Sequence, residues 1–187
     1  AQRQGRAKDG FDRTDPALLK MLLLAYRDKS TAQTPLQGLL TLTPVVPVSV
    51  SYELDPCALD KAHELAVIEQ LGEYITKPDE DLKSMVQGLM GHKGRVRLAF
   101  GESITAASSL EDLTEQLDQT IVANTHLYPT HRYARALNSG LDTQDLVNHP
   151  TVRVLAAELE SLSAAERPFL LQQYANIWRN RQELGIG

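Results

Sequence analysis

The chain has 187 residues, of which 42% are hydrophobic and 23% charged, a composition typical of a globular protein. Its formal net charge of −5 argues against a nucleic-acid-binding protein, which normally carries a basic patch. The apolar stretches at 18–24 and 36–50 are interrupted by charged, Pro or Gly residues and are shorter than the roughly 20 apolar residues that span a bilayer. The sequence therefore predicts no membrane span.

Basic residues are concentrated in the first 29 positions, which hold seven Lys/Arg and four Asp/Glu. This segment favours an anionic ligand or surface, although a solvated basic turn is an equal alternative. The chain begins at Ala1 without an initiator Met or a signal sequence, so we expect a cut end. The single cysteine, Cys57, has no partner for an internal disulfide, which favours a reducing compartment.

The first elements in chain order are a loop and a helix. Residues 1–14 are rich in glycine and charge and predict a loop. Asp15 is a good N-cap and Pro16 fits the first helical position, so a largely buried helix is expected over 16–29. A polar linker is expected over 30–38.

Two strand signals follow, at residues 39–43 and 45–52, where apolar and β-branched residues cluster. Both alternating sets of positions are apolar up to Val48, which favours a strand buried on two faces, as in a parallel sheet. Pro44 and Pro47 place the start of this strand at an edge or bulge.

Helices are then expected over 58–75 and 80–90, followed by a half-buried strand over Val96–Phe100. This order predicts an α/β fold in residues 1–108, with a mixed, mostly parallel sheet flanked by helices. Residues 109–187 are expected to form an all-helical C-terminal region without a strand. Its helices are expected around the apolar stripe of Leu110, Leu113, Leu117 and Ile121 and over 130–137, 143–147, 152–162 and 164–181.

General catalytic signatures are absent from the sequence: there is no phosphate-binding P-loop, dinucleotide-binding glycine motif, nucleophile elbow or zinc-protease motif. The five histidines are scattered. His126 and His131 flank a Tyr-Pro turn but lack neighbours at ligand spacing, so they are interpreted as ordinary loop and helix residues. We expect neither a metal nor a cofactor.

Three sequence blocks stand out: residues 5–10 (GRAKDG), 43–53 (TPVVPVSVSYE) and 94–104 (GRVRLAFGESI). In the first block, the two glycines allow the backbone to approach an anion closely, and Arg6 and Lys8 place positive charge beside it.

The order and spacing of these blocks resemble the bacterial glycerol-phosphate acyltransferase family, which includes glycerol-3-phosphate and 1-acylglycerol-3-phosphate acyltransferases. Residues 5–10 look like the family's Gly-Arg-Ser-Arg-x-Gly loop, 50–53 like its Ile-x-Tyr-Glu, and 100–102 like its Phe-Gly-Glu strand end. Residues 61–65 are similar to the Ala-Lys-Glu-Leu stretch after the strand. The resemblance covers about residues 2–104.

The resemblance implies an acceptor-phosphate site in the first block. Its expected ligands are, in order, Arg6, Lys8 and Arg3, with Gly5 allowing close approach. Arg comes first because its planar fork can meet phosphate oxygens with two hydrogen bonds. Tyr52 and Glu53 are expected to shape the pocket, or equally to cap their strand.

In the family's mechanism, a His removes a proton from a glycerol hydroxyl, which attacks an acyl thioester, and an Asp five positions later orients the imidazole. No His in this sequence has an Asp at that distance. We therefore expect no catalytic residue in this chain, a catalytic pair upstream of it, and no activity from the chain alone.

The implied function is part of an acyltransferase of phospholipid synthesis. Acyl-ACP or acyl-CoA would be the donor, and glycerol 3-phosphate or a lysophospholipid the acceptor. The implied location is cytoplasmic, peripheral on the inner face of the cell membrane. The alternative is a non-catalytic binding or scaffold domain derived from the same fold.

Overall fold

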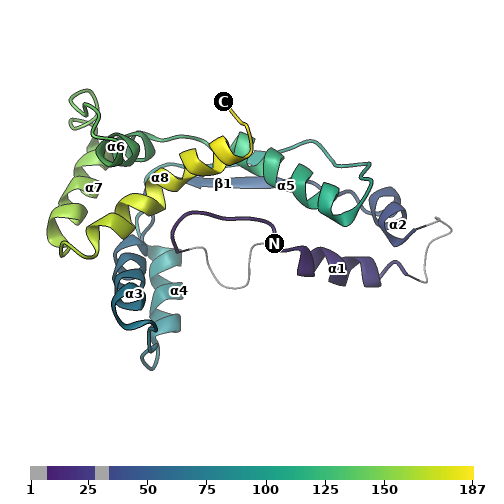
Figure 1. The fold of residues 1–187 in the computed structure, drawn as a ribbon, viewed down its shortest axis with the longest axis horizontal. Coiled ribbons are helices and arrows are strands. Elements are labelled where there is room, and N and C mark those ends of the chain that lie inside the picture. Colours follow the sequence, from purple (N-terminus) through teal and green to yellow (C-terminus); the bar gives the residue numbers. More distant parts are fainter. Residues whose placement is uncertain (1–7, 28–33) are drawn as a thin grey trace.

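The computed structural model describes residues 8–27 and 34–187. Its elements are α1 (Pro16–Leu24), α2 (Pro35–Leu42), β1 (Val48–Tyr52), α3 (Ala58–Leu71), α4 (Glu80–Met90), β2 (Val96–Phe100), α5 (Leu110–Asn124), α6 (Pro129–Asn138), α7 (Pro150–Ser161) and α8 (Arg167–Glu183). The molecule is elongated (Figure 1). Helices α1 and α2 lie at one end, α3, α4, α6 and α7 at the other, and α5, α8 and the sheet between them.

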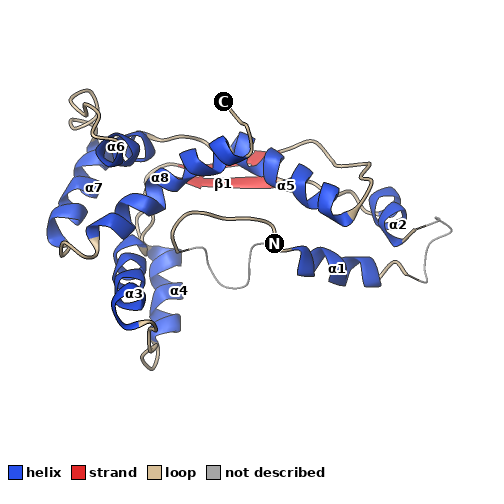
Figure 2. Cartoon of the chain, in the orientation of Figure 1, coloured by secondary structure: helices blue, strands red, loops and turns tan. Residues whose placement is uncertain are grey.

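The predicted mostly parallel sheet is wrong. The described residues form one two-stranded sheet, in which β1 and β2 run antiparallel, and the rest of the regular structure is helical (Figure 2). The segment between the strands, called the excursion below, contains α3 and α4. Its two ends lie side by side, since the Leu54 N–H donates to the Lys93 carbonyl at 3.0 Å. Because the excursion returns the chain to the end of the sheet that it left, β2 must run back along β1.

The apolar face of this sheet is its open face. The register joins its outward side chains in pairs, Val48 with Phe100, Val50 with Leu98, and Tyr52 with Val96, and all six are exposed. The opposite face carries Ser49 and Ser51, which are buried where α5 ends: Ser49 Oγ lies 3.0 Å from Thr125 Oγ1, and the His126 N–H donates to Ser51 Oγ at 2.9 Å. The prediction of a strand buried on both faces is therefore wrong, and so is that of a half-buried β2.

The predicted strand over 39–43 is also wrong, because this segment is the end of α2. Thr34 caps that helix by accepting the Gln37 N–H on its Oγ1 at 3.2 Å, and Pro35 occupies the first helical position. The sequence alone predicts a polar linker over 30–38, and these start signals lie inside it. A good cap can thus begin a helix even where β-branched residues follow.

The other helices lie close to the predicted positions, with different ends. Helix α1 ends at Leu24 and buries only Leu19, so its predicted burial is wrong; residues 28–29 of the prediction lie outside the described part. Helix α3 ends early because Gly72 takes a left-handed conformation, with φ of 84°. The bounds of α4 and β2 are confirmed. The helix predicted over 143–147 is a series of turns, and residues 105–187, all described, contain no strand.

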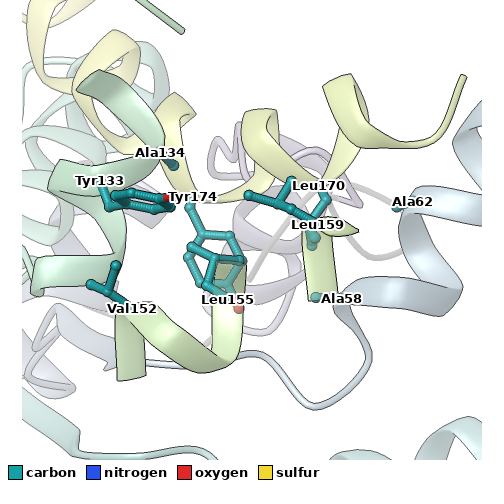
Figure 3. Close-up of a cluster of buried hydrophobic side chains, with 9 residues drawn as sticks. All are labelled: Ala58, Ala62, Tyr133, Ala134, Val152, Leu155, Leu159, Leu170 and Tyr174. Atoms are coloured by element: carbon teal, nitrogen blue, oxygen red, sulfur yellow. The ribbon is translucent and has the colours of Figure 1, made fainter. Parts of the chain in front are cut away.

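Two apolar clusters hold the molecule together. The larger joins α3, α6, α7 and α8 (Figure 3), through Ala58, Ala62, Tyr133, Ala134, Val152, Leu155, Leu159, Leu170 and Tyr174. The smaller joins α1, α2 and α5 and the segment after β2, through Leu19, Leu40, Ile104, Leu113 and Leu117. Because the larger cluster joins α3 to the C-terminal helices, residues on both sides of position 108 share one core. The division after residue 108 remains a prediction.

Candidate functional site

The predicted phosphate-binding residues Arg3, Gly5 and Arg6 lie outside the described residues. Lys8 is described, and its ammonium forms an ion pair with the Glu64 carboxylate of α3. The Lys8 side chain is 33% exposed, so it remains accessible to an anion that competes with Glu64. A phosphate that binds Lys8 would have to displace the Glu64 carboxylate or share the Lys8 ammonium with it.

Residues 8–15, called the strap below, connect the first sequence block to α1 and run beside α8 (Figure 1). Two carbonyls of the strap accept hydrogen bonds from α8: Asp9 from Asn176 Nδ2 at 2.7 Å, and Gly10 from Asn180 Nδ2 at 3.2 Å. Further along, the Thr14 N–H donates to the Asp118 carboxylate of α5 at 2.8 Å. The strap is therefore fastened to two helices of the C-terminal region.

A cleft of about 690 Å³, called the strap cleft, lies between the strap, β1 and the excursion between the strands. Gly10 and Arg13 line it on the strap side, and Val48, Val50 and Tyr52 on the β1 side. The β1 wall is thus apolar, while the strap wall is polar and carries charge of both signs, since Asp12 lines it beside Arg13. Such a cleft suits a ligand with an apolar part and a polar part.

The side chains of Tyr52 and Glu53 lie in different surroundings. Tyr52 lines the strap cleft, and its pocket-shaping role stays a prediction. Glu53 is 1% exposed and is clamped by Arg95, whose Nε donates to Oε2 at 3.0 Å and whose Nη2 donates to Oε1 at 2.9 Å. Thr151 Oγ1 of α7 donates to the same carboxylate at 2.9 Å.

This network makes Glu53 a structural junction between β1, β2 and the C-terminal helices. The Arg95 guanidinium, opposed by burial, lowers the pKa of Glu53 to about 2, so the carboxylate is charged at neutral pH. The Glu53 carbonyl also accepts a hydrogen bond from Thr130 Oγ1 of α6 at 2.7 Å. Neither the carboxylate nor the carbonyl of Glu53 is therefore free to bind a substrate.

A second cleft, of about 780 Å³, opens beside α3 and α4 and includes Lys8, Cys57 and His63 in its lining. The Cys57 thiol donates to the Ser84 carbonyl at 3.5 Å, and His63 Nδ1 lies 2.8 Å from Glu166 Oε1. The thiol therefore has a carbonyl, not an imidazole, as its hydrogen-bond partner. This cleft presents no thiol–imidazole nucleophile among the described residues.

His126 and His131 lie together beside Tyr128, but the geometry does not suggest catalysis. Burial lowers the pKa of His131 to about 4, so its ring is neutral at neutral pH, and its Nδ1 accepts the Tyr128 N–H at 3.0 Å. His131 thus caps the start of α6. No group of three or more His, Cys, Asp or Glu side chains suited to a metal ion occurs in residues 8–27 and 34–187.

The sequence interpretation missed the polar face of α8. Asn176 and Asn180 are four positions apart and so share one side of the helix, a spacing that is visible in the sequence. Their partner, the strap, lies more than 160 positions earlier, and no local pattern connects the two.

Comparison of this chain with protein-family models, curated proteins and solved structures found no match in any of the three.

Proposed function

We propose that this chain is part of an acyltransferase that moves a fatty acyl group from an acyl thioester to a glycerol-phosphate-type acceptor. The proposal rests on the resemblance of residues 5–10, 43–53 and 94–104 to the glycerol-phosphate acyltransferase family. The catalytic His and Asp would come from polypeptide outside this sequence. The chain would supply the acceptor's phosphate site and one wall of the pocket.

The observation that carries the proposal is the strap cleft. It brings Gly10 of the first block within one cavity of Val48, Val50 and Tyr52 of the second, while the third block pairs with the second as β2. The described end of the first block thus lies beside the second block, and the second block lies beside the third. An apolar wall opposite a polar strap suits an acceptor or donor that carries both an acyl chain and a polar head group.

The open apolar face of the sheet supports the same proposal. Six apolar side chains on one face are exposed while two serines on the other are buried, which is the reverse of what a sheet in water favours. We propose that the remainder of the catalytic unit covers this face. The catalytic pair would then reach the acceptor hydroxyl from that side.

In this proposal the chain's own residues bind and orient the acceptor. Arg6, Lys8 and Arg3 would neutralise the phosphate charge, and Gly5 would let the backbone approach it. Tyr52 would border the pocket. Holding the acceptor hydroxyl in a fixed place beside the thioester reduces the entropic part of the barrier, which is the contribution that a binding half can make.

The proposed donors are acyl-ACP or acyl-CoA, and the proposed acceptors are glycerol 3-phosphate or a lysophospholipid. We also propose a peripheral position on the cytoplasmic face of the membrane. No helix in the described ranges has the length and apolarity to cross a bilayer.

The direct test is an acyl-transfer assay with the intact protein that contains this sequence. Radiolabelled acyl-CoA and acyl-ACP are each offered with glycerol 3-phosphate and with lysophosphatidate. The proposal expects acylated product from one acceptor, and none from the 187-residue chain alone. An intact protein that binds the acceptor but forms no product would favour the non-catalytic scaffold instead.

A further inference from the structure

One face of α8 is built to hold the strap. Gln173, Asn176 and Asn180 follow one another at intervals of three and four residues, so they line one side of the helix. The strap crosses this side, where the N-terminal part of the chain meets the C-terminal helices (Figure 1).

The two asparagines bind the strap through their side-chain amides, and Asn180 uses both the donor and the acceptor of its amide. Asn176 donates to the Asp9 carbonyl, while Asn180 donates to the Gly10 carbonyl and accepts from Arg13 Nη1 at 2.7 Å. Asn180 is only 3% exposed, so water does not readily replace these partners. Only a side chain with a donor and an acceptor can satisfy a carbonyl and a guanidinium together at this position.

Gly10 lets the strap lie directly on the α8 backbone. Its φ is 72°, in the left-handed region, and a Cβ at this position would lie 2.2 Å from the Gln173 carbonyl oxygen. Backbone atoms of a helix cannot move aside without breaking the helix. Gly10 is therefore required both by conformation and by space.

The flanks of this contact are also fixed. The guanidinium groups of Arg13 and Arg179 both lie over the Phe11 ring, at 4.5 and 4.6 Å from its centroid. Arg13 Nη2 lies 3.3 Å from a Glu183 carboxylate oxygen. Strap residues 9–13 are thus held on α8 at successive positions.

We propose that α8 is the positioning element of the strap, and that Asn176 and Asn180 are positioning residues that hold Lys8 in place for the acceptor's phosphate. This inference rests on the proposed function. Gly10 ends the first sequence block and lies two residues from Lys8, so the place of Lys8 depends on how the strap is fastened. A binding site whose backbone is already held in place loses little conformational entropy when the phosphate binds. Its affinity for the phosphate is therefore higher.

The experiment uses the intact protein with three single substitutions: Asn176→Ala, Asn180→Asp and Gly10→Ala. Asn180→Asp keeps the size and the acceptor for Arg13 but removes the donor to Gly10. The matched control is Gln182→Ala, an exposed amide on the same helix. Each variant is examined by amide hydrogen exchange of residues 8–14 and by steady-state kinetics with acceptor and donor varied in turn.

The proposal expects exchange of the strap amides to quicken roughly 2- to 10-fold in Asn176→Ala and Asn180→Asp. The acceptor KM should rise roughly 10-fold with little change in the donor KM, since a misplaced site weakens binding of that substrate alone. The more disruptive Gly10→Ala should show larger effects of the same kind. Gln182→Ala should behave as the unsubstituted protein.

Unchanged strap exchange in both asparagine variants overturns the positioning role, whatever the activity. Faster exchange with an unchanged acceptor KM overturns the link to phosphate binding and leaves the acyltransferase proposal standing. If the unsubstituted protein transfers no acyl group, the proposed function fails, and strap exchange alone still decides whether α8 holds the strap.

Discussion

At the scale of single residues, the Glu53–Arg95 pair has a clear consequence for stability. Its carboxylate is buried and receives hydrogen bonds from Arg95 and Thr151, and each of these favours the charged form. Replacing Glu53 by Gln removes the charge while keeping the shape. We predict a loss of about 2 kcal/mol in the free energy of unfolding, measured by urea denaturation, with the exposed Glu160→Gln as control.

The same pair predicts how stability depends on pH. The pKa of Glu53 is lowered from 4.5 to about 2 in the folded state, so its stabilising effect is complete above the unfolded pKa. That effect is lost as the pH falls from about 4.5 toward 2. The free energy of unfolding should therefore fall less steeply across this window in Glu53→Gln than in the unsubstituted chain. Parallel curves would show that the pair does not control acid stability.

Lys8 gives a second prediction at this scale, because Glu64 competes with a phosphate for its ammonium. Glu64→Gln should lower the acceptor KM roughly 2- to 5-fold in the intact protein, since a partly exposed ion pair is worth about 0.2–1 kcal/mol. The gain should vanish in Lys8→Ala/Glu64→Gln. Glu69→Gln, an exposed carboxylate on the same helix, is the control, and an equal effect there would mean a general charge effect rather than release of Lys8.

At the scale of elements, the open face of the sheet predicts a difference between the 187-residue chain and the intact protein. Leu98→Thr should change the free energy of unfolding of the chain alone by less than about 0.5 kcal/mol, because Leu98 is exposed there. In the intact protein the same change should cost about 1–3 kcal/mol if the face is covered. The exposed Val154→Thr on α7 is the control. Equal small effects in both would contradict a covered face.

Local signals predicted elements better than they predicted how those elements combine. Helix α4 and strand β2 were predicted with correct bounds, because glycine and the change of periodicity mark their ends. Helix α2 was misinterpreted because its apolar residues also fit a strand, and only the Thr34 cap distinguishes the two. The direction of β2 depends on the closure between Leu54 and Lys93, which no local pattern encodes.

The candidate site was predictable to the same extent. The sequence predicts that Tyr52 shapes a pocket or caps its strand; in the structure it lines the strap cleft, and a role in acceptor binding stays a prediction. The sequence did not reveal that Arg95 binds the Glu53 carboxylate, or that Asn176 and Asn180 hold the strap. These contacts join positions 42 to 170 residues apart, so they depend on the tertiary fold rather than on spacing.

At the scale of the whole molecule, the proposed peripheral location predicts binding to lipid vesicles. The chain has a net charge of −5 but a basic first segment, so attraction to a membrane would depend on local charge. We predict that the intact protein floats with anionic vesicles at low salt and is released at about 1 M salt, where the Debye length is about 3 Å. Equal binding to zwitterionic vesicles, or binding that survives high salt, would contradict a charge-based peripheral contact.

The central claim is that the basic first block binds the acceptor's phosphate, and Arg6→Ala in the intact protein tests it most directly. Removing a charge-assisted contact worth about 1.5–3 kcal/mol should raise the acceptor KM roughly 10- to 100-fold. The donor KM should barely change, and Arg153→Ala, an exposed arginine on α7, should affect neither. An Arg6→Ala protein with unchanged acceptor KM and unchanged turnover would show that this block is a solvated turn, and the acyltransferase proposal would lose its main residue-level support.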